Sequence, residues 1–136
     1  MSYKSFNGKW RVYADSPIIS ILPTGLFCFN TVCYERFIKP ANYKYVKLYY
    51  DPEAKKIAFE LLTGKPGEPI RLVKTERIAL VSGKAFLSQF GIKYEGEVRS
   101  YPVHETTIHE NTSGQGYKDR WIGVKGIEIR LDEIKN

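Results

Sequence analysis

Between Lys44 and Leu62 the chain alternates apolar and polar residues in two short runs, and no other feature constrains the fold as strongly. The apolar positions are Val46, Leu48, Tyr50, Ile57, Phe59 and Leu61, and those between them are Tyr45, Lys47, Tyr49, Lys56, Ala58 and Glu60. A period of two is typical of a strand with one buried face. Residues 51–54 (DPEA) supply a turn, so the segment predicts a β-hairpin. Its register should be fixed, because a slip by one residue would expose the apolar set.

The residues before this hairpin predict another hairpin and a short helix. Residues 9–13, 18–22 and 26–29 have the composition of strands, and residues 23–25 (PTG) form a turn, since Pro presets φ and Gly accepts a positive φ. Asn30 suits a helix N-cap, and residues 31–38 place apolar side chains on one side, which predicts two helical turns. We expect Lys39-Pro40 to end this helix, because proline disfavours helical geometry in the residue before it.

The residues after the hairpin predict further strands around one more short helix. A loop rich in Gly and Pro, 63–69 (TGKPGEP), precedes expected strands at 70–73 and 77–81. Ser82 is a candidate N-cap for a helix over residues 84–90, which Gly91 is placed to end. Strand composition returns at 97–108 and 121–131. The predicted fold class is therefore α+β, a mainly antiparallel β-sheet with two short helices.

The length of 136 residues favours a single domain with a sizeable core, and the loop at 63–69 is the place where it could subdivide. The two parts could be similar strand–helix–hairpin halves. Aligning Asn30 with Ser82 places Tyr34 with Phe86, and Ile38 with Phe90 likewise. The alternative is that polar caps and apolar helix faces simply recur in an α+β domain.

The order hairpin, helix, hairpin, with a Thr24-Gly25 turn in the first hairpin and an acidic turn in the second, resembles the AbrB-type swapped-hairpin domain of small prokaryotic DNA-binding regulators. The resemblance covers residues 19–29, 31–38 and 45–61, about a third of the chain. In that family two chains exchange hairpins to form one dimeric domain, and basic residues near the first hairpin contact DNA. Pro23 departs from the basic or polar residues usual there.

The stretches GLFCFN, YVKLYYDPEAKKIAFEL and GKAFLSQFGI are also similar to uncharacterised proteins of bacteria, archaea and their viruses, and this second resemblance implies no activity. Together the two resemblances imply a small prokaryotic or viral protein, with a regulatory role on DNA implied by the first alone.

Charge and aromatic content favour a nucleic acid as the partner, since the chain carries a net charge of +6 and ten tyrosines. Lysines would approach phosphates and release counterions, and Tyr45 and Tyr49 would stack on unpaired bases. The candidate contacts are Lys44, Tyr45, Lys47, Tyr49, Lys55 and Lys56, with Lys118 and Arg120 in a second basic segment. The alternative is a solvated or covered sheet face in a protein-interaction or structural module.

No motif predicts an enzyme, a cofactor or a metal. His104 and His109 are five residues apart, whereas the metalloprotease motif needs a spacing of four on a helix. Cys28 and Cys33 are too few for a zinc site, and we expect two reduced, buried thiols. With no signal-peptide core or membrane-length apolar run, we expect a cytoplasmic protein without membrane association. We also expect a homodimer, because unpaired sheet edges are often completed by a partner.

Overall fold

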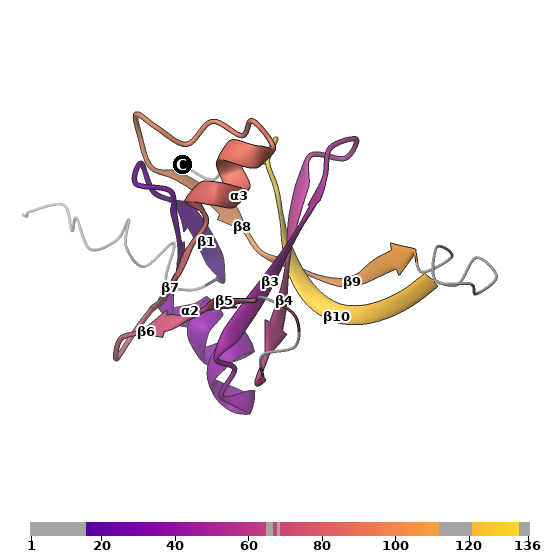
Figure 1. The fold of residues 1–136 in the computed structure, drawn as a ribbon. Helices are drawn as coiled ribbons and strands as arrows, with labels where there is room; N and C mark the ends of the chain where they lie inside the picture. Colours follow the sequence, from indigo (N-terminus) through magenta and orange to yellow (C-terminus); the bar gives the residue numbers. More distant parts are fainter. Residues whose placement is uncertain (1–15, 65–66, 68, 112–120, 134–136) are drawn as a thin grey trace, which may run out of the picture.

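The computed structural model describes residues 16–64, 67, 69–111 and 121–133, which form strands joined by short helical segments (Figure 1). The strands are β1 (Ile18–Ile21), β2 (Leu26–Phe29), β3 (Tyr45–Asp51), β4 (Lys56–Leu62), β5 (Ile70–Arg71), β6 (Val73–Lys74), β7 (Ala79–Ser82), β8 (Arg99–Pro102), β9 (His104–Asn111) and β10 (Trp121–Arg130). The helical segments are α2 (Thr31–Cys33), η1 (Tyr34–Ile38), η2 (Lys39–Ala41) and α3 (Lys84–Gln89). The strand expected at residues 9–13 lies outside the described residues.

The strands form two five-stranded sheets, and each pairing between them is antiparallel. Sheet A has the order β6-β7-β2-β1-β8, and sheet B has the order β5-β3-β4-β10-β9. The prediction of an α+β fold dominated by antiparallel strands, with two short helical regions, is confirmed. Both sheets combine strands from before and after the loop at 63–69, so the two parts of the chain share one core.

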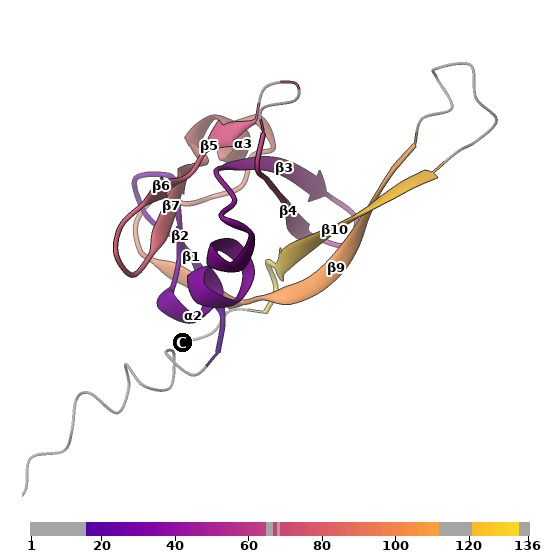
Figure 2. The same cartoon turned by 90° about the horizontal axis from the view of Figure 1, so that it is seen from below.

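Two bent strands join the sheets to each other. Only Leu72 separates β5 of sheet B from β6 of sheet A, and only Val103 separates β8 of sheet A from β9 of sheet B. Strands that bend from one sheet into the other form the corners of many two-sheet folds. Each sheet therefore continues into the other on both sides, and the path of paired strands closes around the interior seen in Figure 2.

The strand order also has a two-fold arrangement. Residues 18–62 contribute the hairpins β1/β2 and β3/β4 with a helical segment between them, and residues 73–130 contribute β6/β7 and β9/β10 with α3 between them. In sheet A the first hairpin of each part lies next to the other through β2 and β7. In sheet B the second hairpins adjoin through β4 and β10. The two parts thus occupy corresponding places in the fold.

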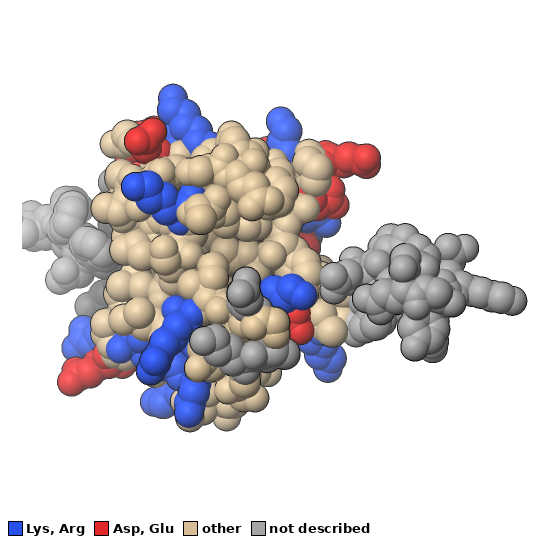
Figure 3. Space-filling view, viewed as in Figure 1, with Lys and Arg blue, Asp and Glu red and all other residues tan. Residues whose placement is uncertain are grey.

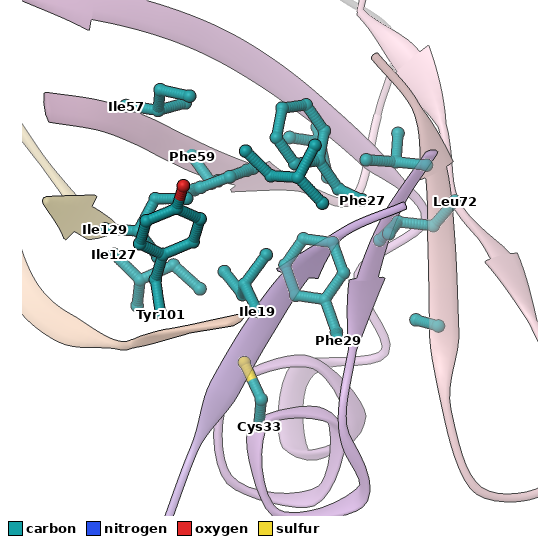
Figure 4. Packing of buried hydrophobic residues seen from close by; sticks show 14 of the residues in the cluster. Ile19, Phe27, Phe29, Cys33, Ile57, Phe59, Leu72, Tyr101, Ile127 and Ile129 are labelled. Carbon is teal, nitrogen blue, oxygen red and sulfur yellow. The ribbon is translucent and has the colours of Figure 1, made fainter. Parts of the chain in front are cut away.

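The core fills the space between the sheets. The rings of Phe27 and Phe29 on β2 and of Phe59 on β4 meet edge to face, with centroids 5.1 Å and 5.5 Å from Phe59. Edge-to-face pairs add to the stabilisation from burial. In Figure 4 these rings point to the same interior as Ile19 and Tyr101 from sheet A. The sheets are thus held by side chains at alternate positions, the pattern from which the strands were predicted.

The central hairpin has the predicted register. Val46, Leu48 and Tyr50 lie opposite Leu61, Phe59 and Ile57, respectively, so one face of the hairpin is apolar. The turn is closed by Asp51, whose Oδ1 accepts hydrogen bonds from the backbone N–H groups of Glu53 and Ala54, both at 3.1 Å. This is the turn role expected of a short carboxylate side chain.

The first helical segment begins as predicted and ends differently. The side-chain oxygen of Asn30 accepts a hydrogen bond from the backbone N–H of Cys33 at 2.9 Å, which confirms the N-cap. After α2 the chain widens into the π-helical turn η1 and then tightens into the 3₁₀ turn η2, so it passes through Pro40. Proline fits early in a 3₁₀ turn because its missing N–H would have no partner there. The segment ends at Asn42, where φ is +52°.

The second helix begins at Lys84, as predicted, but its N-cap lies one residue later than predicted. Gly83, and not Ser82, is its N-cap residue, and it has no side-chain capping bond. A Cβ atom at Gly83 would lie 2.2 Å from Cε2 of Phe27, so the core ring at this point requires glycine. The helix ends at Gln89, close to the predicted end. Among the described residues, no helix has the length and apolar character needed to cross a lipid bilayer.

Candidate nucleic-acid interface

The outer face of the β3/β4 hairpin carries the tyrosines and lysines that the sequence singled out. Tyr45, Lys47 and Tyr49 alternate with the buried Val46 and the half-buried Leu48, so they point away from the core. Lys47 is exposed, and the two tyrosines are half-buried. The helical segments could have covered these residues. In the described part of the chain, α3 and the helical segment 31–41 lie elsewhere (Figure 1).

Tyr49 is held in place by two neighbours. Its hydroxyl group donates a hydrogen bond to Oε1 of Glu60 at 2.7 Å. The ammonium group of Lys47 lies 5.3 Å from the centre of its ring, within the range of a cation–π contact. A ring positioned in this way has already lost much of its rotational freedom, which lowers the cost of ordering it when a ligand binds.

The same face also carries carboxylates, so it is not uniformly basic. Glu60 lies opposite Lys47 in the ladder, and Glu128 lies opposite Ala58. Glu128 is 5% exposed, with Nε of Arg130 at 2.9 Å and Nζ of Lys56 at 3.7 Å from its Oε2. The charge of Lys56 is therefore partly engaged within the protein. The sequence alone did not indicate this, because the pairing of β4 with β10 joins segments about 70 residues apart.

Burial and hydrogen bonding act on Glu128 in opposite directions. Burial alone would raise the pKa of its carboxyl group, since it disfavours the charged form. Hydrogen bonds from Arg130 and Thr106, together with the charges of Lys56 and Arg130, outweigh burial and hold the pKa below its usual value. Glu128 thus stays ionised on β10, on the outer face of sheet B.

A group of basic residues surrounds the start of β3, and we call it the basic corner. Its members are Lys44, Lys47, Arg71 and Lys74. Arg71 on β5 lies directly opposite Tyr45 on β3. Figure 3 shows basic side chains gathered at the lower left, over the region of β6 and the helical segment. Three of the four are exposed, and Lys74 is half-buried.

The charges of two lysines of the basic corner act on each other. Partial burial and the neighbouring charge of Lys44 lower the pKa of Lys74 below its usual value. Nζ of Lys74 also donates a hydrogen bond to Oδ1 of Asn42 at 2.9 Å, which fixes it beside the end of η2. Like charges held together repel, and an anion between them would relieve that repulsion. The basic corner is therefore suited to bind a phosphate.

The predicted contact residues fall into separate groups. Lys44, Tyr45 and Lys47 belong to the basic corner or adjoin it, whereas Lys55 and Lys56 lie at the opposite end of the hairpin, about 20 Å away along the strand. Lys118 and Arg120 lie outside the described residues. Arg71 and Lys74 were missed, because their place beside β3 depends on a bent strand that follows a long loop. The sequence signal that could have identified them as contact residues was their basic character next to a short apolar run.

Other reactive side chains are accounted for by local structure. Burial raises the pKa of the Cys33 thiol, and Cys28 is half-buried, so both are poor nucleophiles. Nε2 of His104 lies 2.6 Å from Oε1 of Glu133. Within the described residues, no group of three His, Cys, Asp or Glu side chains is arranged to hold a metal ion.

Comparison of the chain with protein-family models, curated proteins and solved structures gave no match. Its function is therefore inferred from the residues of the basic corner and the outer face of sheet B.

Proposed function

We propose that the protein binds single-stranded nucleic acid through the basic corner and the adjoining tyrosines of β3. One observation carries the proposal: Tyr45 lies on an exposed strand face between Lys47, two residues along its own strand, and Arg71, directly opposite on β5. Alternating cations and aromatic rings are the combination that binds unpaired strands, because cations follow the phosphates while rings stack on bases.

Each part of the basic corner has a role in this proposal. Lys44 and Lys74 hold one phosphate between them, and Arg71 with Lys47 holds its neighbour. Tyr45 stacks on the base between these phosphates, a contact that contributes roughly 1–3 kcal/mol per base. Contact with the backbone and with ring faces does not distinguish bases strongly, so the binding tolerates different sequences. Such a role is compatible with a cytoplasmic protein that has a regulatory function.

The test is fluorescence anisotropy of labelled single-stranded and double-stranded oligonucleotides, titrated with the protein at two salt concentrations. We expect saturable binding, tighter for the single strand, that weakens as salt rises. The double variant Arg71→Gln/Lys74→Gln should bind more weakly and show a salt slope lower by about 0.7 for each phosphate that the protein no longer neutralises. Lys93→Gln, an exposed lysine in the loop after α3, is the control and should leave both unchanged.

Absence of binding at low salt by the folded protein would overturn the proposal. It would leave the second candidate, a protein-interaction module, which a separate observation favours. The half-exposed ring of Phe90 lies 5.0 Å from Phe86 and 5.1 Å from Tyr50, centre to centre, and Val98 in the following loop is 54% exposed. Exposed apolar groups of this kind are found where proteins contact one another.

The homodimer expected from the sequence remains a prediction. Within the described residues the closed strand path needs no second chain to pair its edges, and the hairpins that two chains exchange in the AbrB-type domains have counterparts in the two parts of this chain. Analytical ultracentrifugation with and without the oligonucleotide decides between one and two chains.

A further inference from the structure

The outer face of sheet B is hollowed at the end of β3 that lies away from the basic corner. The hollow has a volume of about 460 Å³, in the range of sites that hold small planar groups. It crosses the strands β3, β4, β10 and β9, and six of its lining residues matter for its chemistry. These are Tyr49, Lys56, Ala58, Thr106, Ile108 and Glu128.

A small residue, Ala58, lies in the floor of this groove. Ala58 lies directly opposite Tyr49 on one side and Glu128 on the other. Gly126 follows on β10, and a Cβ atom there would lie 2.8 Å from the carbonyl oxygen of Phe59 and 2.6 Å from Cδ1 of Ile108. The strand therefore cannot carry a larger residue at this point. Ile108 fills the space above Gly126, so the slot lies over Ala58, between the aromatic wall of Tyr49 and the aliphatic wall of Ile108.

The polar groups of the groove come from all four strands: Asp51 from β3, Lys56 from β4, Thr106 from β9 and Glu128 from β10. Glu128 is fixed by Arg130 and Thr106, as described above. Lys56 reaches the same carboxylate at 3.7 Å, yet its side chain remains 37% exposed, so its ammonium group can also contact a ligand. The slot between Tyr49 and Ile108, with the accessible ammonium group of Lys56 at its rim, fits a flat ring that carries a phosphate.

We propose that this groove binds one unpaired base of the strand held at the basic corner, with Tyr49 as its stacking partner and Lys56 on the adjacent phosphate. The inference rests on the proposed function, since Tyr45, Lys47 and Arg71 lie on the same outer face of sheet B as the groove. Tyr45 and Tyr49 are four residues apart on β3, about 13 Å, and stacked nucleotides rise about 3.4 Å each. A single strand of about five nucleotides therefore reaches from one tyrosine to the other.

The test fills the groove without changing charge. Ala58→Phe places a ring on the floor, and we expect it to weaken binding of a labelled twelve-nucleotide single strand about tenfold, the loss of one stacked base. The slope of log affinity against log salt should stay close to that of the wild type, because the basic corner is intact. Ala54→Phe, the same change in the exposed β3/β4 turn, is the matched control and should bind like the wild type.

Tyr49→Leu provides a second variant, in case Ala58→Phe does not fold as judged by circular dichroism and thermal melting. It removes the aromatic wall and leaves the floor unchanged, and the same tenfold loss is expected. Wild-type binding that neither folded variant weakens would overturn the groove proposal and leave the proposed function standing. No binding by the wild-type protein at low salt would overturn both, so the two failures are distinguishable.

Discussion

Residues 18–62 and residues 73–130 build the same arrangement with different chemistry. Each part supplies a hairpin to sheet A, a short helical segment, and a hairpin to sheet B, and the corresponding hairpins adjoin through β2 with β7 and β4 with β10. Yet the residues that cap and close these elements differ. The order of elements and the alternation of apolar positions therefore fix the architecture, while local side chains remain free to vary.

The helical segments show the difference most clearly. In the first part, the side chain of Asn30 bonds three backbone groups: it accepts from the N–H groups of Ile18 and Cys33 and donates to the carbonyl oxygen of Ser16. In the second part, Gly83 begins α3 without a side-chain bond, because the ring of Phe27 occupies the space. The first part stabilises its helix by polar contacts. The second part has a glycine in place of a side-chain cap, which leaves room for a ring of the shared core.

The test with the largest expected effect on stability asks whether the two parts fold as one unit. Phe59→Ala removes a fully buried ring that contacts Phe27 and Phe29 and lies opposite Ile127 of the other part. We expect a loss of about 3–5 kcal/mol in the free energy of unfolding, since a cavity remains. Urea denaturation followed by circular dichroism should still show a single transition.

Phe90→Ala is the matched control, because it removes the same side chain from a site that is 41% exposed. A loss of about 1 kcal/mol is expected there, since much of the ring is already in water. Two separate transitions in the Phe59→Ala protein would contradict the shared core and show that the parts fold independently.

The sequence predicted the elements whose evidence is local. The alternation from Tyr45 to Leu62 was sufficient for the hairpin and its register, and Asn30 was sufficient for the first N-cap. What it could not predict depends on contacts between distant segments. The N-cap is Gly83 and not the predicted Ser82, and the ring of Phe27 on β2 requires glycine there. The carboxylate that engages Lys56 belongs to Glu128 on β10. The basic corner needed the bend at Leu72, which no short-range pattern marks.

The next test concerns the polar cap that distinguishes the first part. Asn30→Ala removes three hydrogen bonds at a half-buried site, and we expect a loss of about 2–3 kcal/mol in the free energy of unfolding. Asn30→Asp keeps the accepting oxygen and loses only the donor to Ser16, so its loss at pH 7 should be smaller. Equal losses in the two variants, measured by urea denaturation, would show that the cap oxygen contributes little.

A third test addresses the seam where the two parts meet in sheet B. The pKa of Glu128 lies below its usual value in the folded protein, so the stability it contributes is present above the unfolded pKa of about 4.3 and is lost as pH falls through the folded pKa. Glu128→Gln should lower the free energy of unfolding by about 1–2 kcal/mol at pH 7.

Urea denaturation of the Glu128→Gln protein and of the wild type at pH 7, 4 and 3 should show the difference between them shrinking as pH falls. A constant difference across this range would mean that the carboxylate is not held in its charged form by Arg130 and Thr106, contrary to the geometry at the seam.

The smallest effect is expected at the turn of the first part's hairpin, where Lys55 has a φ of +54°. Lysine is strained in this region and glycine is not, but glycine also loses more chain entropy on folding. Lys55→Gly should therefore raise the free energy of unfolding, measured by urea denaturation, by only about 0.5 kcal/mol. Ala54→Gly, at a neighbouring turn position without a positive φ, should lower it slightly instead, because there glycine brings the entropic cost alone.

Lys55→Gly also distinguishes the contributions of the two ends of the hairpin to oligonucleotide affinity, since Lys55 lies about 20 Å from the basic corner. Measured by fluorescence anisotropy, this variant should keep nearly the oligonucleotide affinity of the wild type, whereas Lys44→Gln should weaken it. The two variants each remove one positive charge, so a difference between them reports position and not net charge. A larger loss from Lys55 than from Lys44 would move the phosphate contacts to the turn and away from the basic corner.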